Sequence, residues 1–284
     1  MRVVVTGARG LLGGAITREF VTCHEVSALD RSSLDVTDGN AVASVIDRER
    51  PDVVINCAAY NDVDGAEDDP VLALRTNAFA VLALARVAIA TGAILIHFSS
   101  DFVFDGDTDR PYVEEDQPNP RSVYAASKLL GDLFALETPR AYVLRVESLF
   151  GPAGPDGGRR GSLGTIVDGI RRGAEVPLFV DRVVSPSYTP DLARAARALL
   201  ERDVPPGLYH CVNSGHATWS DIAERAASLM EVELRMRPVT LETAGLRARR
   251  PRYCALANAK LASVGIEMPP WQEALRQFLS GGSG

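Results

Sequence analysis

The residues best suited to chemistry are a tyrosine and a lysine four positions apart, Tyr124 and Lys128. The chain has seven tyrosines but only two lysines, and residues at positions i and i+4 share one face of a helix. A phenol with a pKa near 10 is a poor acid or base at neutral pH until a neighbouring ammonium group stabilises its phenolate. The pair therefore predicts proton transfer to or from a carbonyl or alcohol oxygen, with Tyr124 as the acid or base.

A proton transfer to a carbonyl oxygen needs a hydride donor for the carbonyl carbon. Three glycines near the N-terminus, Gly7, Gly10 and Gly13, point to a cofactor that could supply it. Gly7 and Gly10 allow a tight turn at which the N–H groups of a helix start, at Leu11 and Leu12, can hold a pyrophosphate, and Gly13 allows close packing of helix on strand. The Gly-x-x-Gly-x-x-Gly spacing is a weak signal in a chain with 24 glycines. Its place between an apolar run and an amphipathic segment indicates a nicotinamide dinucleotide site.

The next two residues concern the choice between NADP and NAD, which stays open. Asp30 ends the second predicted strand, where an acidic residue hydrogen-bonds the ribose 2′-hydroxyl of NAD. Arg31 beside it could instead accommodate the 2′-phosphate of NADP. The alternative for Asp30 is a turn or helix cap.

A third catalytic group is expected from Ser99 or Ser100. Both follow a predicted strand and so lie at its carboxyl end, where open α/β sheets bind ligands. We choose Ser100 as the group that polarises the carbonyl and place Ser99 beside the cofactor. A purely structural role as helix or turn caps is the alternative.

Short β-branched runs alternate with amphipathic segments in the first half of the chain, which is typical of βαβ units around a parallel sheet. Thr37 and Asp38 precede the second predicted helix and are expected to supply its cap, and Pro51 is expected to mark its end. Strands are predicted at residues 2–5, 25–29, 53–56, 94–98 and 142–146, and helices at 11–20, 40–49, 70–90 and 123–136.

The fold class is therefore α/β, a Rossmann-type doubly wound parallel sheet with a smaller C-terminal substrate-binding domain. Residues 1–149 form the predicted dinucleotide-binding domain, with later segments near 178–215 returning to it, and residues 150–284 are mainly the substrate-binding domain. Residues 151–164 are expected to be a flexible connection and residues 280–284 a disordered tail. Helices in this half are predicted at 164–172, 191–201, 219–230 and 270–279.

Composition restricts the partners of the chain. A net charge of −7 makes broad binding to nucleic acid an unfavourable hypothesis. The longest apolar run contains Arg75 and Arg86, so no membrane span is expected, and the N-terminus reaches glycine too early for a signal peptide. Histidines and cysteines show no zinc spacing. These features favour a cytoplasmic enzyme without a catalytic metal.

The segments with recognisable motifs are residues 6–13, 34–38, 51–60, 98–106, 124–129, 185–188 and 250–251. With these, nearly the whole chain resembles the extended short-chain dehydrogenase/reductases and, within them, the dTDP-4-dehydrorhamnose reductase family. The resemblance implies reduction of the 4-keto group of a dTDP-linked deoxyhexose by NADPH or NADH, and permits a homodimer.

The resemblance also assigns roles to single residues. It implies that Asp35 and Val36 line the adenine side of the cofactor, that Ala58 and Ala59 lie along it, and that Asn77 supports the helix that carries Tyr124. Ser100, Tyr124 and Lys128 are the implied catalytic residues. The expected cofactor contacts also include Asn77, Tyr124 and Lys128. The implied substrate contacts are Ser100, Asp101, Phe102, Tyr124, Ser148, Ser185 and Arg250.

Two departures from the family pattern concern the sugar. Thr-Asp-Tyr of the family is Ser100-Asp101-Phe102 here, which keeps the hydroxyl but loses a phenol. Where the family has Arg-Thr-Ser-Trp-Val-Tyr, this chain has Ser148 in place of the tryptophan and adds the carboxylate of Glu147. We therefore expect a pocket of different shape and polarity, and a deoxyhexose other than the rhamnose precursor is an open alternative.

A run of arginines near the C-terminus could meet the diphosphate of a sugar nucleotide. Its members are Arg247, Arg249, Arg250 and Arg252. The alternative is a solvated basic turn.

Two other functions are weighed against the reductase. A sugar-nucleotide epimerase or dehydratase with tightly held NAD needs the same Tyr, Lys and Ser. A non-catalytic NAD(P)-binding regulatory subunit keeps the dinucleotide site alone. The intact set of Ser100, Tyr124 and Lys128 argues against the second of these.

Overall fold

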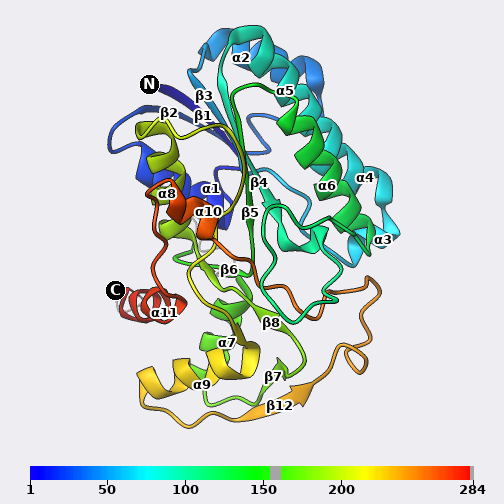
Figure 1. The fold of residues 1–284 in the computed structure, drawn as a ribbon, viewed down its shortest axis with the longest axis vertical. Helices are drawn as coiled ribbons and strands as arrows, with labels where there is room; N and C mark the ends of the chain where they lie inside the picture. Colours follow the sequence, from blue (N-terminus) through cyan, green and yellow to red (C-terminus); the bar gives the residue numbers. More distant parts are fainter. Residues whose placement is uncertain (154–160, 282–284) are drawn as a thin grey trace.

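Six parallel strands form a central sheet in the order β10-β5-β4-β3-β1-β2 (Figure 1). The structure is a computed structural model, and it describes residues 1–153 and 161–281. The order reverses direction at β1, because the chain first runs outward to β2 and then returns to β3 on the other side. The strands are β1 (Arg2–Thr6), β2 (Glu25–Leu29), β3 (Val53–Asn56), β4 (Ile94–Ser100), β5 (Ala141–Val146) and β10 (Gly207–His210). The predicted Rossmann-type α/β fold is confirmed.

Helices cover both faces of the sheet, which explains why β3 and β5 are buried along their whole length. On one face lie α1 (Leu11–Phe20) and α8 (Thr189–Glu201), which pack against each other. On the other face lie α2 (Gly39–Glu49), α5 (Ala80–Thr91) and α6 (Val123–Leu136) (Figure 1). The side chain of Asp38 accepts hydrogen bonds from the backbone of Asn40 and Ala41, which confirms the predicted cap of α2.

The segment predicted as one helix over residues 70–90 is interrupted. It consists of α4 (Pro70–Leu74), a π-helical turn, η1 (Arg75–Phe79), and α5. The single-helix prediction was wrong here because an extra residue enters the turn around Asn77, a distortion that is frequent at functional sites.

The same segment, Pro70–Thr91, is long and apolar enough by composition to cross a membrane, with a mean hydropathy of 1.6. Arg75 and Arg86 therefore do not exclude a membrane-spanning composition, contrary to the prediction. In the fold, Val81, Leu84 and Ala88 of this segment are buried in the core shared with α2 and the sheet. Packing within the protein buries this face, whereas Val71, Phe79 and Ile89 of the same segment are exposed.

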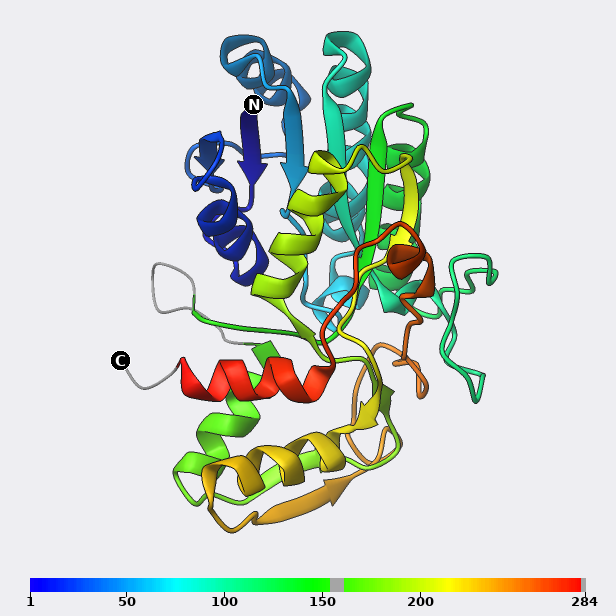
Figure 2. The same ribbon diagram turned by 60° about the vertical axis from the view of Figure 1, so that its left-hand side comes forward.

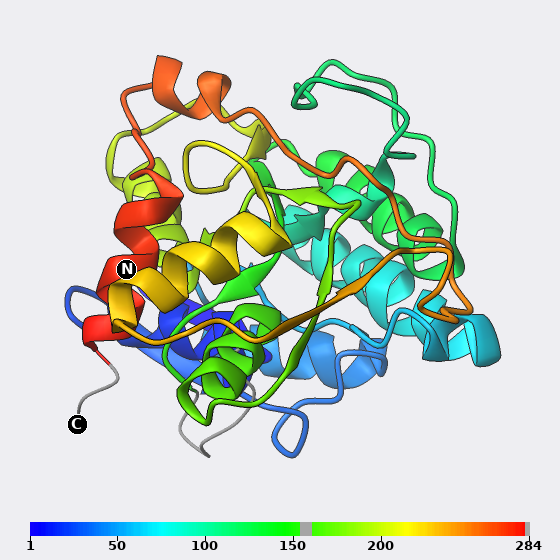
Figure 3. The ribbon, with the colours of Figure 1, turned by 90° about the horizontal axis from the view of Figure 1, so that it is seen from below.

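A second hydrophobic core lies beyond the carboxyl ends of the strands, toward which the arrowheads point in Figure 2. Its helices, seen from below in Figure 3, are α7 (Gly161–Arg171), α9 (Trp219–Met230) and α11 (Trp271–Ser280). Three short strand pairs join them: β6 (Leu149–Phe150) with β9 (Ser187–Tyr188), β7 (Val176–Phe179) with β12 (Met236–Val239), and β8 (Val183–Val184) with β11 (Ala217–Thr218). The remaining short helices are α3 (Gly65–Asp68), η2 (Asp101–Val103) and α10 (Ala259–Ser263).

Two expected irregular segments differ from their predictions. Helix α7 begins at Gly161, three residues before the predicted start, and Ser280 closes α11 instead of opening a tail. Residues 154–160 of the expected connection and 282–284 of the expected tail lie outside the described residues.

Segments after residue 149 complete the main sheet. Strand β10 pairs with β5, and α8 packs on α1, both within the range predicted to return. Leu261, Ile266 and Met268, which lie later in the chain, also join this core. The division into domains at residue 149 stays a prediction.

Candidate active site

The turn between β1 and α1 has the geometry that the glycine pattern predicts. Gly7 has φ +66°, and a Cβ there would lie 2.7 Å from the backbone nitrogen of Ala58. A Cβ on Gly13 would collide with the carbonyl oxygen of Gly7. Gly10 caps α1 without a side-chain hydrogen bond, so the N–H groups of the first turn remain available to an anion. These features fit a bound pyrophosphate.

A cavity of about 370 Å³ opens beside this turn, at the carboxyl ends of β1, β2 and β3. We call it the dinucleotide cavity. Of the residues predicted to hold a cofactor, its lining contains Gly7, Gly10, Asp30, Arg31, Asp35, Val36, Ala58 and Ala59. Arg9 and Cys57 line it as well and were missed, although both lie next to motif residues in the sequence.

The carboxylate of Asp30 is already engaged by its own turn. It accepts hydrogen bonds from the backbone and the side chain of Ser32, which lower its pKa to about 2, and it pairs with Arg9 at 3.2 Å. Asp30 therefore makes the contacts of a turn cap, as the alternative interpretation predicts. Arg31 lines the same cavity. Two arginines flank the place expected for the adenosine ribose.

A second cavity of about 530 Å³ adjoins the first, with Arg9, Gly10, Cys57, Ala59 and Asn61 in the lining of both. We call it the catalytic cavity. The predicted residues in its lining are Leu11, Leu12, Gly13, Ser99, Ser100, Asp101, Phe102, Tyr124, Lys128 and Ser148. The fold therefore joins the end of β4, the start of α6 and the residues after β5 at one opening.

Tyr124 lies at the start of α6, where Ser122 caps the helix by accepting a hydrogen bond from Ala125. Burial raises the pKa of Tyr124 to about 12, against a lowering contribution from Ser100. Its ring meets Phe102 edge to face, with 5.5 Å between the ring centres. The expectation of a lowered pKa does not hold in this environment, because burial disfavours the phenolate. Tyr124 is held as a neutral acid with a proton to donate.

Lys128 is buried one turn further along α6. Its Nζ donates a hydrogen bond to the carbonyl oxygen of Phe98 at 2.7 Å. Burial lowers its pKa to about 8, while the neighbouring carboxylate of Asp132 acts in the opposite direction. Below that pH the lysine is an ammonium, and its bond to β4 fixes its place relative to the sheet.

Asn77, in the π-helical turn, lines neither cavity but hydrogen-bonds both Tyr60, which lines the dinucleotide cavity, and Ser127 of α6. Its side chain accepts a hydrogen bond from the backbone N–H of Tyr60 at 2.8 Å and donates to the carbonyl oxygen of Tyr60 and to Ser127 Oγ, each at 3.0 Å. Ser127 precedes Lys128. These contacts are what support of the active-site helix would require.

Ser100 is the last residue of β4. Its hydroxyl donates to Asp101 Oδ1 at 3.0 Å and accepts from the backbone N–H of Phe102 at 3.2 Å. The capping role that was weighed as an alternative therefore coexists with a position in the cavity wall beside Tyr124. Ser99 lines the same cavity and is 4% exposed.

Two predicted substrate contacts are not brought into either cavity lining. Ser185 is fully buried, and its backbone N–H donates to Glu147 Oε2 at 2.6 Å. Arg250 pairs with Asp64 at 3.0 Å and lies 5.9 Å from the centre of the Phe102 ring. Ser185 therefore contacts Glu147 of the cavity lining, and Arg250 lies near Phe102 of the lining.

The arginine run lines a separate cavity of about 410 Å³, with Asp105 and Asp107 among its other residues. Arg247 donates to Asp68 at 2.7 Å, and Arg249 lies 4.0 Å from Asp107. Much of this charge is balanced by acidic partners, as in the alternative of a solvated basic turn.

Arg182 had no signal in the sequence. Its guanidinium lies 5.8 Å from the centre of the Phe102 ring, donates to Cys254 Sγ at 3.0 Å and donates to the carbonyl oxygen of Pro251. Residues 182 and 254 are distant in sequence, and the fold brings them together next to Phe102, which follows β4.

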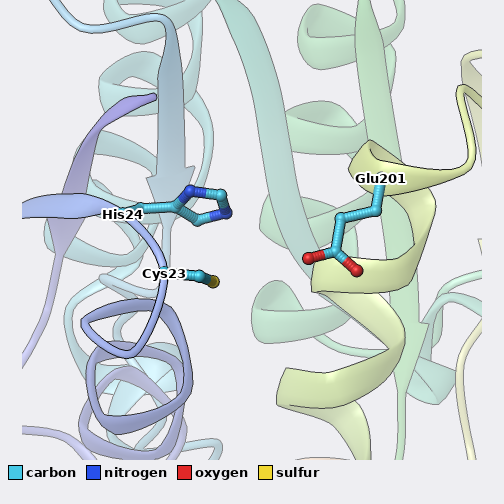
Figure 4. Close-up of side chains that lie close together, drawn as sticks. All are labelled: Cys23, His24 and Glu201. Atoms are coloured by element: carbon cyan, nitrogen blue, oxygen red, sulfur yellow. The ribbon is translucent and has the colours of Figure 1, made fainter.

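Two groups of described residues place three possible metal-ligand atoms within 4.8 Å of one another. One group, Asp101, Glu147 and Cys254, is buried beside the catalytic cavity. The other lies far from it, where Cys23 and His24 face Glu201 of α8 (Figure 4). The spacing argument did not anticipate either group, because each depends on residues distant in sequence. The expected absence of a metal stays a prediction.

Comparisons with known proteins agree with this geometry. The chain is 36% identical over 97% of its length, and 92% of the relative, to dTDP-4-dehydrorhamnose reductase of Streptomyces griseus. It is 36% identical over 98% of its length, and 94% of the relative, to a probable dTDP-4,6-dihydroxy-2-methyloxan-3-one 4-ketoreductase of Streptomyces antibioticus. A crystal structure of dTDP-4-dehydrorhamnose reductase from Bacillus anthracis in complex with NADP superposes with a TM-score of 0.92 at 31% identity, covering 99% of both chains.

The family model described as the RmlD substrate binding domain matches residues 1–282. This match spans the glycine turn, both cavities and the C-terminal core. The chain belongs to the RmlD substrate binding domain family.

Proposed function

We propose that this chain reduces the 4-keto group of a dTDP-linked deoxysugar with NADPH or NADH. The observation that carries the proposal is the joint position of Ser100, Tyr124 and Lys128 at the cavity that adjoins the dinucleotide cavity. Relatives at 36% identity are named as reductases of such keto groups, and the solved reductase from Bacillus anthracis contains NADP.

The protein side of the reaction follows from the proton states. When bound, the reduced nicotinamide supplies a hydride to the carbonyl carbon. Tyr124, kept protonated by burial, donates its proton to the carbonyl oxygen. The ammonium of Lys128 stabilises the phenolate that remains. The hydroxyl of Ser100, which donates to Asp101 in the free chain, turns to the substrate to polarise the carbonyl.

We further propose that NADPH is preferred over NADH. The carboxylate of Asp30 is used by Ser32 and Arg9 and is therefore a weakened acceptor for a ribose hydroxyl. Arg9 and Arg31 both line the same cavity, and arginine is well suited to binding a phosphate.

Net oxidation of NADPH by a panel of dTDP-4-keto-6-deoxyhexoses tests the function. We expect the nicotinamide absorbance to fall and mass spectrometry to find a product two mass units heavier than the sugar supplied. Unchanged absorbance with every sugar and with both cofactors would overturn the reductase proposal. Conversion of the sugar without net cofactor oxidation would instead support the epimerase alternative.

A nucleotide sugar is the proposed small-molecule partner. The cytoplasmic location, the homodimer and the lack of nucleic-acid and membrane partners remain predictions from composition and resemblance. Sedimentation of the purified chain at several concentrations would test the homodimer.

A further inference from the structure

Two buried carboxyl groups stand together in the wall of the catalytic cavity. Asp101 follows β4 and Glu147 follows β5, and these neighbouring strands pair Ser100 with Val146, so the two acids are adjacent by register. Both line the cavity together with Tyr124. Their exposed fractions are only 4% and 2%.

One oxygen of each carboxyl group has a well-formed hydrogen bond and the other does not. Asp101 Oδ1 accepts from Ser100, and Glu147 Oε2 accepts from Ser185. Asp101 Oδ2 and Glu147 Oε1 are shielded from solvent and have no hydrogen bond of normal geometry among the residues that the structure describes, although the thiol of Cys254 lies close to both and helps to lower the pKa of Asp101. Buried polar atoms are nearly always hydrogen-bonded, so these two oxygens require an explanation.

The buried cation beside the pair is Arg182. Arg182 attracts both carboxylates, but its own hydrogen bonds go to Cys254 and to the carbonyl oxygen of Pro251. Burial raises the pKa of Asp101 to about 6, and burial together with the charge of Asp101 raises the pKa of Glu147 well above its usual value. Two carboxyl groups that are buried side by side favour sharing one proton over ionising together.

We propose that Asp101 and Glu147 form a subsite for a hydroxyl group on the carbon next to the carbonyl that is reduced. A protonated and an ionised carboxyl group together offer one donor and one acceptor, which is what a hydroxyl group needs. Asp101 is hydrogen-bonded to Ser100, so this pair lies one hydrogen bond away from the group that binds the carbonyl. Ser148, small and with φ +44°, borders the same wall and leaves room for the ligand.

The subsite rests on the proposed reductase function and adds to it a basis for choosing the sugar. A site with buried hydrogen-bonding groups strongly rejects an analogue that lacks the matching hydroxyl, because those groups are then left unpaired. The chain is thus expected to select 4-keto sugars that keep the hydroxyl over sugars that are deoxygenated at that carbon.

Two dTDP-4-keto-6-deoxyhexoses that differ only in the hydroxyl at C3 provide the test. We expect the native chain to favour the hydroxylated sugar by roughly tenfold or more in kcat/KM. Glu147→Leu should lower kcat/KM for the hydroxylated sugar, leave the deoxygenated one nearly unchanged and bring their ratio close to one. Asp101→Asn preserves volume and serves if the leucine variant does not fold. It slows both sugars through Ser100, but the ratio should still fall.

Asp191→Asn is the matched control, because Asp191 is a buried carboxyl group in α8 that bonds Asn213 and Arg194 outside both cavities. It should leave the ratio unchanged. If the native chain reduces both sugars equally, or if Glu147→Leu and Asp101→Asn retain the native ratio, the subsite is wrong while the reductase stands. If neither sugar is reduced with either cofactor, the proposed function itself fails.

A metal ion at Asp101, Glu147 and Cys254 is the competing use of the same atoms. Dialysis against a chelator should leave the ratio of the two sugars unaltered. Loss of the preference on chelation, with recovery on adding a divalent cation alone, would replace the hydroxyl subsite by a metal site.

Discussion

The dinucleotide cavity and the catalytic cavity share a border but are built in different ways. The first is lined by residues from short stretches of chain, of which the Gly7 turn and the Asp30 turn are the clearest. The second shares the glycine turn and adds residues from the carboxyl ends of β4 and β5 and from the start of α6.

Their polar groups differ in the same way. Asp30 accepts hydrogen bonds from Ser32 and Ser33 of its own turn and from Arg9 of the glycine turn. Asp101 and Glu147 each keep a buried oxygen without a hydrogen bond of normal geometry among the described residues. A motif that binds a common cofactor can be made locally, whereas a pocket that must fit one sugar is assembled from distant residues. Four substitutions or conditions would sharpen or break this contrast.

The largest effect is expected from removing the acid of the catalytic cavity. Tyr124→Phe should lower kcat roughly 10²- to 10⁴-fold, the range for general acid catalysis, while the dissociation constant for NADPH stays near its native value. Stopped-flow reduction and fluorescence titration measure the two quantities. Tyr209→Phe is the control, because it also removes a buried phenol, one that bonds Pro205 away from both cavities. Full activity in Tyr124→Phe would exclude this residue from the mechanism.

The next effect concerns the backbone of the dinucleotide cavity. Gly7→Ala places a Cβ 2.7 Å from the backbone nitrogen of Ala58, so we expect the affinity for NADPH to fall by about tenfold or more. Gly92→Ala is matched in backbone strain, since φ is +74°, but no atom lies within 4 Å of its Cβ. Calorimetric titration should show native affinity in the control. Equal loss in both variants would mean that strain alone, and not the close approach, matters at Gly7.

The dependence of kcat and of NADPH binding on pH should differ, because Lys128 belongs to the catalytic cavity. Lys128 is an ammonium below its pKa of about 8 and neutral above it, so kcat should fall as the pH rises through 8. Binding of NADPH should change little over the same interval, because no catalytic ammonium belongs to the dinucleotide cavity. In Lys128→Arg the side chain stays charged, and the decline should move to higher pH. A decline that stays near pH 8 in this variant would assign it to another group.

The smallest effect is expected at the edge of the dinucleotide cavity. Arg31→Ala should raise KM for NADPH by about tenfold, the loss of one charged contact to a phosphate, and leave KM for NADH nearly unchanged. Arg48→Ala is a suitable control, because Arg48 is an exposed arginine paired with Glu49. Identical changes for NADPH and NADH in Arg31→Ala would count against a 2′-phosphate contact.

The sequence by itself determined the parts of this protein that depend on near neighbours along the chain. Local periodicity, steric freedom and helical spacing predict five of the six strands of the parallel sheet, a cap at Thr37 or Asp38, the Gly7 turn, and the placement of Tyr124 and Lys128 on α6. Such features are readable because the interacting residues lie within a few positions of one another. Strand β10 was not predicted.

Only the tertiary structure decided what depends on distant residues and on burial. It inserted the π-helical turn at Asn77, reversed the expected pKa shift of Tyr124, and kept Ser185 and Arg250 out of the walls of the dinucleotide and catalytic cavities. It also brought Asp101 and Glu147 together, since the register of β4 against β5 sets which residues emerge side by side at the edge of the sheet. Desolvation and register belong to the packed fold as a whole, and no short stretch of sequence contains them.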